Sequence, residues 1–334
     1  MAKNIKKILT GITTTGTPHI GNYLGAIKPS LELATENNQR SYFFLADYHA
    51  IIKNQNPEEI KKSVKGVALA WLSSGLDTKK SYFYRQSDVT EITELNWILT
   101  CLTSKGLMNR AHAYKAAISS NTLEDEKKIT MGLFSYPILM AADILIFNST
   151  HVPVGKDQVQ HLEMTRDIAI RFNHTFGNVF NLPEAIIPKI ESLVPGTDGR
   201  KMSKSYNNVI PLLCDEKTLK KTIAKIVTNS LEPGEPKKFE NCNVYKLFTY
   251  FSEADEIESF KEDYRNGISW GDAKKKLFLQ MNDKLNNIRE NYERVSKQKD
   301  LVNDLLVEGA KKVRPEAAEM LDKVKKLIGI CKIK

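Results

Sequence analysis

Cysteine is scarce in this chain of 334 residues, which contains only four of them. Zinc sites and iron–sulfur clusters take closely spaced cysteine or histidine ligands, and disulfide frameworks take many cysteines in a short chain. The four cysteines here lie far apart and include no CxxC pair: Cys101, Cys214, Cys242 and Cys331. We therefore expect reduced, mostly buried thiols and no protein-bound structural metal.

Long hydrophobic runs are missing as well, and none approaches the roughly 18 residues that cross a bilayer. The first residues, MAKNIKKILTGI, place lysines before a short apolar stretch, as signal peptides do. That stretch is too short, however, and it leads into a Gly/Thr-rich turn without a small-residue cleavage site. We expect a cytoplasmic protein without membrane contacts, in which residues 6–12 form a buried strand.

The charge balance is basic, with a formal net charge of +9, in a composition of 41% hydrophobic and 27% charged residues that is typical of globular proteins. Residues 310–334 contain eight Lys and Arg against three Asp and Glu. This excess indicates either a surface that faces nucleic acid or a solvated helix face, and composition does not choose between the two. The length allows one large domain and a smaller one.

Short apolar runs alternate with segments of helical period in the first half of the chain. The runs at 6–12, 41–51 and 79–87 predict strands, and the segments at 20–36 and 58–75 predict helices, the second ending at a glycine signal. Such alternation predicts a Rossmann-like, doubly wound parallel α/β sheet. Because ligands bind at the carboxyl ends of the strands in such sheets, the residues just after the first two strands are well placed for function.

The pattern changes near residue 211. From about Asp215 onward the segments are long, amphipathic and helical, and strand signals are almost absent. We therefore predict a helical domain over 211–300 and a further C-terminal helix within 301–334 that packs back on the first domain, 1–210.

A glycine-containing loop, Gly16-Thr17-Pro18-His19-Ile20-Gly21-Asn22, separates the first predicted strand from the next helix. Backbone N–H groups at a helix N-terminus bind anions, and Gly21 allows close approach of a nucleotide. His19 and Asn22 could donate hydrogen bonds to phosphate oxygens there. A turn with a surface histidine is the alternative.

A second loop, Asp198-Gly199-Arg200-Lys201-Met202-Ser203-Lys204-Ser205, carries two lysines three residues apart beside two serines. A loop of this kind can close over a polyphosphate, so that its lysines neutralise the charge that develops on the leaving group. By composition alone, an exposed basic linker is the alternative.

Taken together, these loops resemble the paired signatures of class I aminoacyl-tRNA synthetases. Residues 19–22 are similar to a variant of the HIGH motif, and residues 201–205 match KMSKS letter for letter. Residues 131–148 resemble the specificity helix of the tryptophanyl-tRNA synthetase family, and residues 152–169 its ATP-ribose and amino-acid loop. Tyrosyl enzymes typically carry a GGSDQ-type sequence where this chain has Gly-Lys-Asp-Gln at 155–158.

The resemblance implies a reaction and its participants. L-tryptophan is activated with ATP, accompanied by Mg²⁺, to the adenylate and pyrophosphate, and is then transferred to the 3′ end of tRNA(Trp). It implies a homodimer with one tRNA spanning both subunits. In these terms 1–210 is the catalytic domain with the dimerisation insertion, and 211–300 binds the anticodon.

The resemblance also assigns site residues. The predicted catalytic residues are His19, Asn22, Lys201, Ser203 and Lys204. The predicted ATP-binding residues are Thr13, Thr14, Thr15, Gly21, Asn22, Gly155, Asp157, Lys201, Met202, Ser203 and Lys204, with Asp157 on the ribose hydroxyls. The predicted tryptophan-binding residues are His49, Tyr136, Met140, Asp143, Val152, Val154 and Gln158, with Tyr136 and Gln158 on the α-amino group.

Asp143 also stands out without the resemblance. It lies in an apolar helical segment, where burying a carboxylate is costly unless it meets a donor or a cation. The indole N–H is a donor only, so a carboxylate suits it, and Met140 on the same face offers a polarizable wall. The alternatives are a structural carboxylate at Asp143, a core position at Met140, a structural histidine at His49 and a helix N-cap at Asp157.

Three positions depart from the family pattern. Thr13 stands where a glutamine is common, Leu9 where an aromatic residue is common, and Lys156 where an acidic residue is common. These differences concern the fine packing of the indole pocket. A tyrosyl-tRNA synthetase, a small-cofactor adenylyl transferase and an inactive paralogue are the rival readings.

Overall fold

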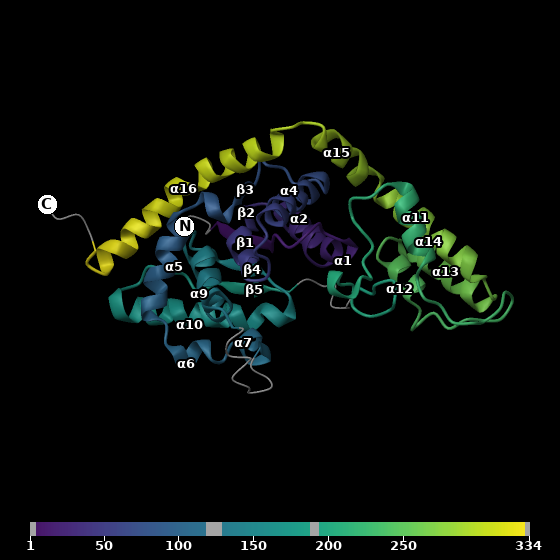
Figure 1. Ribbon diagram of the computed structural model, residues 1–334, viewed down its shortest axis with the longest axis horizontal. Coiled ribbons are helices and arrows are strands. Elements are labelled where there is room, and N and C mark those ends of the chain that lie inside the picture. The colour runs from purple at the N-terminus through teal and green to yellow at the C-terminus, as the bar shows by residue number, and fades with distance from the viewer. Residues whose placement is uncertain (1–4, 118–128, 188–193, 331–334) are drawn as a thin grey trace.

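The computed structural model describes residues 5–117, 129–187 and 194–330. Five strands form one parallel sheet in the order β3-β2-β1-β4-β5, which lies near the centre of Figure 1. The strands are β1 (Lys6–Thr13), β2 (Gln39–Ala46), β3 (Tyr82–Arg85), β4 (His151–Pro153) and β5 (Glu184–Ile186). The predicted Rossmann-like, doubly wound α/β fold is confirmed.

The strand order reverses next to β1. The chain runs from β1 to β2 and β3 on one side, and then places β4 and β5 on the other side of β1. A crevice opens at such a reversal, outside the carboxyl ends of the strands, and ligands bind there in open α/β sheets. Here that crevice is bordered by the loops that begin after Thr13 in β1 and after Pro153 in β4.

Successive side chains of a strand point to opposite faces of the sheet, and an apolar core packs on each face. In β2, Phe43 and Leu45 belong to one apolar core, and Tyr42 and Phe44 belong to the other. Helices close both layers. Those before β5 are α1 (Ile20–Asn22), the π-helical η1 (Tyr23–Ile27), α2 (Lys28–Ala34), α3 (Asp47–Ile51), α4 (Pro57–Ser73), the 3₁₀ turn η2 (Gln86–Asp88), α5 (Glu91–Leu102), α6 (Lys105–Met108), α7 (His112–Ala117), α9 (Met131–Leu145), the 3₁₀ turn η3 (Lys156–Gln158) and α10 (Val159–Phe176).

Two details of the first half differ from expectation. The second predicted strand ends at Ala46, and the following residues form α3 instead, although they continue the apolar run. The thiol of Cys101 is exposed rather than buried, while Cys214 and Cys242 are partly buried, and all three are free. Cys331 lies outside the described residues.

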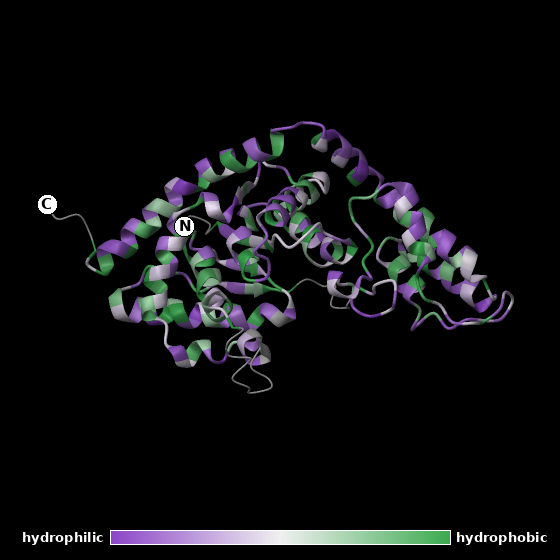
Figure 2. Cartoon of the chain, in the orientation of Figure 1, coloured by the Kyte–Doolittle hydropathy of each residue, from purple (hydrophilic) through white to green (hydrophobic). Residues whose placement is uncertain are grey.

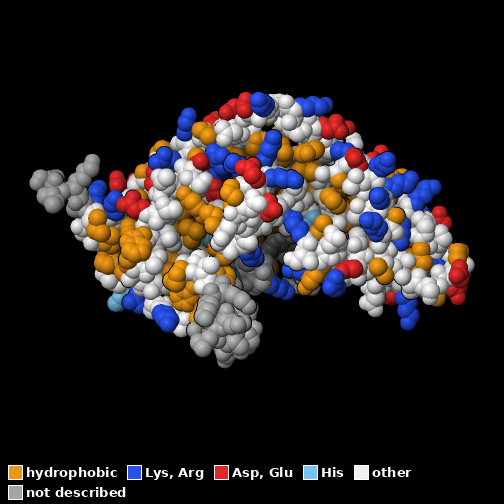
Figure 3. All heavy atoms as spheres, viewed as in Figure 1, with side chains coloured by type: hydrophobic (Ala, Val, Ile, Leu, Met, Phe, Trp, Pro, Cys, Tyr) orange, Lys and Arg blue, Asp and Glu red, His pale blue; other side chains and the backbone are white. Residues whose placement is uncertain are grey.

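The helical part follows the 3₁₀ turn η4 (Lys204–Tyr206). Its helices are α11 (Glu216–Ala224), α12 (Asn243–Thr249), α13 (Ala254–Arg265), α14 (Trp270–Lys284) and α15 (Asn286–Ser296), and the described residues from 211 onward contain no strand. Asp215 caps α11, where its carboxylate accepts from the Thr218 N–H at 2.6 Å. Each helix turns its apolar stripe inward (Figure 2). In the space-filling view a hollow with Lys and Arg side chains at its rim lies near the middle of the face shown (Figure 3).

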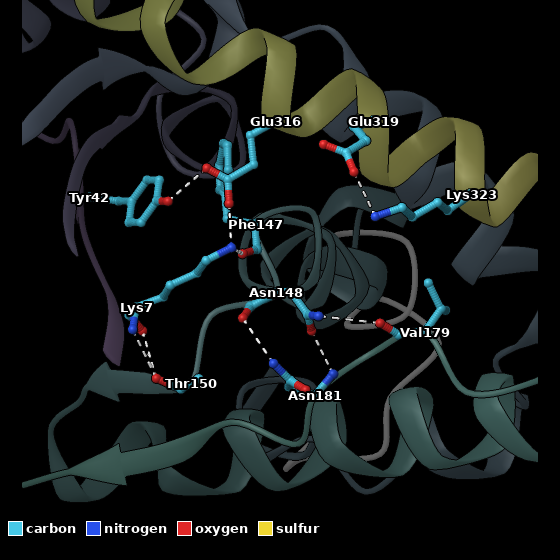
Figure 4. Close-up of polar contacts among 10 residues, drawn as sticks. All are labelled: Lys7, Tyr42, Phe147, Asn148, Thr150, Val179, Asn181, Glu316, Glu319 and Lys323. Carbon is cyan, nitrogen blue, oxygen red and sulfur yellow. Dashed lines mark hydrogen bonds and ion pairs between the residues drawn. The ribbon is translucent and has the colours of Figure 1, made fainter. Parts of the chain in front are cut away.

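The last helix, α16 (Leu301–Leu327), returns across the molecule to the edge strand β3. A Cβ added at Gly309 would lie 1.7 Å from the Phe83 carbonyl oxygen, so the two backbones touch there. Glu316 fastens the helix, because it accepts from the Tyr42 hydroxyl at 2.8 Å and forms an ion pair with Lys7 (Figure 4).

Candidate active site

The loop after β1 holds its histidine by a reciprocal cap. His19 is the N-cap of α1: its Nδ1 accepts from the Asn22 N–H at 3.3 Å, and the Asn22 side chain accepts from the His19 N–H at 3.1 Å. Gly16 bends this loop with φ +72°, and its N–H donates to the Ser63 hydroxyl at 2.7 Å. The loop is therefore fixed both by its own helix and by α4.

The second loop is organised around a buried asparagine. Asn208 is 1% exposed, and its Oδ1 accepts from the Ser203 N–H at 2.7 Å. Its Nδ2 donates to Asp198 at 2.6 Å and to the Lys201 carbonyl at 3.1 Å. One amide thus fastens three residues of this loop, and the Lys204 side chain, next to them, reaches the first loop.

The two loops meet at the reversal point of the sheet. The Gly21 N–H contacts the Met202 sulfur at 3.3 Å, and the Lys204 ammonium donates to the Thr15 carbonyl. Between them lies a cavity of about 370 Å³, which contains lysine and no carboxylate among its described lining residues. These are Ile12, Thr13, Thr15, Gly16, Pro18, His19, Asn22, Lys53, Asn54, Val67, Ser203, Lys204 and Ser205. Such a lining suits a polyanion.

Burial keeps the histidine of this cavity neutral. Desolvation, together with the nearby Lys204 charge, lowers the pKa of His19 to about 4. Because Nδ1 accepts a backbone hydrogen bond, the neutral ring carries its proton on Nε2 and can donate from there. Burial also lowers the pKa of Lys204 from its usual range.

The second part of the site is the buried carboxylate of Asp143 on α9, which is 1% exposed. Gln86 donates to both of its oxygens, at 2.8 and 3.0 Å, and His49 on α3 lies 3.0 Å from Oδ2. Desolvation raises the pKa of Asp143, against the opposing effects of these hydrogen bonds. The cost of burying this carboxylate is thus offset by two partners, as its apolar setting requires.

The other residues predicted to bind tryptophan differ in their exposure. Val152 and Val154 are buried in the same apolar core, and Met140 packs against it half-buried. The Tyr136 hydroxyl lies 2.6 Å from His161 Nε2. Gln158, the N-cap residue of α10, is exposed and makes no capping bond.

Not every predicted residue reaches the cavity. Lys201, Gly155 and Thr14 are absent from its lining, and Thr14 is buried with no hydrogen-bond partner for its hydroxyl among the described residues. Gly21 and Met202 serve the contact between the loops instead. Asp157 lies in η3, but its side chain falls outside the described part of the structure.

Sequence reasoning also missed contributors. Lys53 and Asn54 line the cavity from the turn after α3, and Gln86 holds Asp143. A lone Lys or Gln in a short loop has no periodic signature, so no signal in the chain singles these residues out.

Over the described ranges, no group of three or more His, Cys, Asp or Glu could hold a metal ion, and no helix is long and apolar enough to cross a membrane.

The family described as tRNA synthetases class I (W and Y) matches residues 2–286, most of the chain. The chain belongs to this family. As a class I tRNA synthetase it is an aminoacyl-tRNA ligase, and the predicted family is confirmed.

Individual class I synthetases match over nearly the full length. A tryptophan–tRNA ligase of Neisseria meningitidis is 50% identical over 333 residues, covering 98% of this chain and 99% of the relative. One of Pseudomonas aeruginosa is 48% identical, covering 97% of this chain and 74% of the relative. The crystal structure of tryptophanyl-tRNA synthetase from Campylobacter jejuni, complexed with ADP and tryptophan, aligns with a TM-score of 0.87 at 41% identity, covering 97% and 99% of the two chains.

Proposed function

We propose that this class I synthetase is a tryptophan–tRNA ligase. It activates L-tryptophan with ATP to the adenylate and pyrophosphate, and then transfers tryptophan to the 3′ end of tRNA(Trp). The observation that carries the proposal is the full-length match, at 50% identity, to a relative of that name. The buried Asp143 carboxylate, and a cavity whose described lining residues include lysine but no carboxylate, give it a physical basis.

In this proposal the pocket around Asp143 reads the amino acid. The indole N–H donates to the carboxylate, which is buried and already oriented. Met140, Val152 and Val154 pack against the ring, with His49 beside it. Tyr136 and Gln158 hold the α-amino group.

ATP occupies the cavity between the two loops. A tryptophan carboxylate oxygen attacks the α-phosphorus, and the bond to the β-phosphate oxygen breaks to release pyrophosphate. His19 donates from Nε2 and Asn22 from its amide to the phosphates. Lys204 and Lys201 neutralise the charge on the leaving group, and the Ser203 hydroxyl donates to it. To do so, Lys204 exchanges its hydrogen bond to the Thr15 carbonyl for one to phosphate. Gly155 and Asp157 hold the ribose.

Mg²⁺ enters with ATP as part of the substrate. The described lining of the cavity offers it hydroxyls and amides but no carboxylate, so the phosphate oxygens supply its main ligands. In the second step a terminal ribose hydroxyl of the tRNA attacks the adenylate carbonyl, and AMP leaves. Residues 1–210 carry this chemistry and residues 211–300 read the anticodon. We place the enzyme in the cytoplasm as a homodimer, where one tRNA spans both subunits.

ATP–pyrophosphate exchange with each of the twenty amino acids, followed by charging of tRNA(Trp), tests this function. Exchange with tryptophan alone and charging of tRNA(Trp) are expected. Exchange with tyrosine would keep the fold and the reaction class but overturn the substrate. No exchange with any amino acid at adequate Mg²⁺ would overturn the proposal.

A further inference from the structure

Gln86 occupies an unusual place for an uncharged polar side chain. It is the first residue of η2, directly after β3, and it is fully buried at 0% exposure. Its Oε1 accepts from the Tyr48 N–H at 3.1 Å, and its Nε2 donates to both oxygens of Asp143. Because Oε1 is taken by a backbone donor, the amide has one orientation, in which the NH₂ group faces the carboxylate.

The surroundings of Asp143 show what this donor does. From α3, His49 reaches Oδ2, while the negative charge of Asp47 opposes ionisation of the carboxyl group. From β3, the buried Tyr84 hydroxyl has no hydrogen-bond partner among the described residues, and its pKa is raised well above the usual range by desolvation and by the nearby Asp143 charge. An imidazole donates or accepts according to its tautomer, but an amide NH₂ always donates. Gln86 is therefore the donor to Asp143 whose role does not change with protonation.

A second network fixes Gln86 itself. The Asp47 carboxylate accepts from the Tyr48 N–H at 3.1 Å and from the Ser87 N–H at 3.0 Å, and it contacts the Ser87 hydroxyl. These bonds tie the start of α3 to Ser87, the residue that follows Gln86 in η2. The amide is thus held by backbone that is hydrogen-bonded independently of any ligand.

We propose that Gln86 is a positioning residue that keeps Asp143 an oriented, ionised acceptor for a ring N–H. It thereby sets the selectivity of the pocket for an indole over a ring of the same shape that lacks the N–H group. This inference rests on the proposed function. It assigns to Gln86 a role in recognition rather than in catalysis, since the amide acts only through Asp143.

The test compares tryptophan with 3-(benzothiophen-3-yl)alanine, in which sulfur replaces the N–H group, in pyrophosphate exchange by Gln86→Leu. We expect KM for tryptophan to rise roughly tenfold or more, with kcat changed less than about threefold, because a charge-assisted hydrogen bond orients the acceptor. KM for the sulfur analogue should change less than about threefold, so the preference for tryptophan falls about tenfold. KM for ATP should stay constant.

Gln280→Leu provides a matched control. Gln280, in the helical part, also donates to a carboxylate and a backbone carbonyl, at 2.8 Å to Glu256 and 2.9 Å to Phe251. Its substitution should leave exchange and the tryptophan preference unchanged. Thermal unfolding of each variant and its affinity for ATP identify a protein that has failed to fold.

Gln86→Glu keeps the proposal testable if the leucine variant unfolds. Two adjacent buried carboxyl groups can share one proton, which restores a donor toward Asp143. The quantity to compare is KM of the variant for tryptophan divided by KM of the unsubstituted protein at the same pH. For Gln86→Glu this ratio should therefore fall as the pH is lowered from about 8 to about 6. KM of Gln86→Leu should rise over the same range, because Asp143 takes up a proton more readily without its donor.

The outcomes separate the inference from the function on which it rests. If the unsubstituted protein exchanges with tryptophan and Gln86→Leu keeps both its KM and its preference over the sulfur analogue, the role of Gln86 is refuted. Equal losses for the two amino acids would also refute it, since they indicate a structural role. If the unsubstituted protein shows no exchange with tryptophan, the proposed function itself fails.

Discussion

The cavity between the two loops and the surroundings of Asp143 both lie where strands of the sheet end, but they are built differently. The cavity is made mostly of loop residues, and the Lys204 ammonium there bonds a backbone carbonyl that ATP can replace. Asp143 is buried instead, and Gln86 and His49 already contact its two oxygens, which leaves acceptor positions on the carboxylate for one further donor. In the cavity, Lys204 can exchange a protein partner for a ligand. At Asp143, the protein holds the acceptor in one orientation before any ligand binds.

The largest effect is expected from a substitution that removes the charge of Asp143. Asp143→Asn retains the volume but places an NH₂ group against the NH₂ group of Gln86, and the proposed acceptor for the indole N–H loses its charge. We expect kcat/KM for tryptophan to fall roughly 100-fold, with KM for ATP unchanged within about threefold. Exchange kinetics measure both. Asp283→Asn, on the exposed surface, is the control, and an equal loss for ATP would contradict the division between the two parts of the site.

The second largest effect is expected at Lys204, in the cavity between the two loops. Lys204→Ala should slow adenylate formation at least about tenfold, because one charge-assisted contact is worth about 1.5–3 kcal/mol. Tryptophan affinity, measured by equilibrium binding without ATP, should not change. Lys275→Ala on the exposed surface of α14 is the matched control. An unchanged single-turnover rate would remove Lys204 from the mechanism.

A smaller effect appears in stability. The pKa of His19 is lowered to about 4 in the folded state, from 6.5, so the unfolded chain binds more protons between these values. Folding stability should therefore rise with pH in this window, and the contribution present at neutral pH is lost as pH falls toward 4. His19→Asn, which can still cap α1, should reduce the difference in unfolding free energy between pH 5 and pH 7 by about 1–2 kcal/mol. Urea unfolding of both proteins at both pH values tests this, and an undiminished difference would assign the pH dependence to other groups.

The smallest effect is expected at Lys53. Its ammonium has no ion pair or hydrogen bond within the described residues and lies at the exposed side of the cavity. Lys53→Met should raise KM for ATP and for pyrophosphate by about threefold, since an exposed charge contributes little. KM values in both directions of the first step measure this, with Lys275→Met as control. A change in KM for tryptophan alone would contradict the placement of Lys53 in the ATP cavity.

The sequence predicts the fold well because periodicity is a property of whole segments. The runs that form β1, β2 and β3 and the segment that forms α4 all stand out in this way. The end of β2 does not, since Asp47–Ile51 continues an apolar pattern, and only the packed structure shows that it forms α3. A local sequence pattern does not predict the conformation where packing against neighbouring elements determines it.

The candidate site is predictable only where residues form a contiguous motif. His19 and Lys204 belong to such motifs and line one cavity, 185 positions apart in sequence. Thr14 was expected there too, but its side chain is buried beside those of Thr13 and Thr15, which reach the cavity. Gln86 has no motif at all. Its role depends on a contact 57 positions away along the chain, with Asp143, which only folding creates.

The contact between α16 and β3 has a consequence for synthesis of the chain. An unpaired edge strand offers its backbone groups to other chains, and covering it with a helix prevents that pairing. Here the cover comes from residues 301–327, while the strand it protects ends at Arg85. On the ribosome, more than two hundred residues are thus translated after β3 before its cover exists. During that interval the outer edge of β3 lacks the helix that covers it in the folded protein.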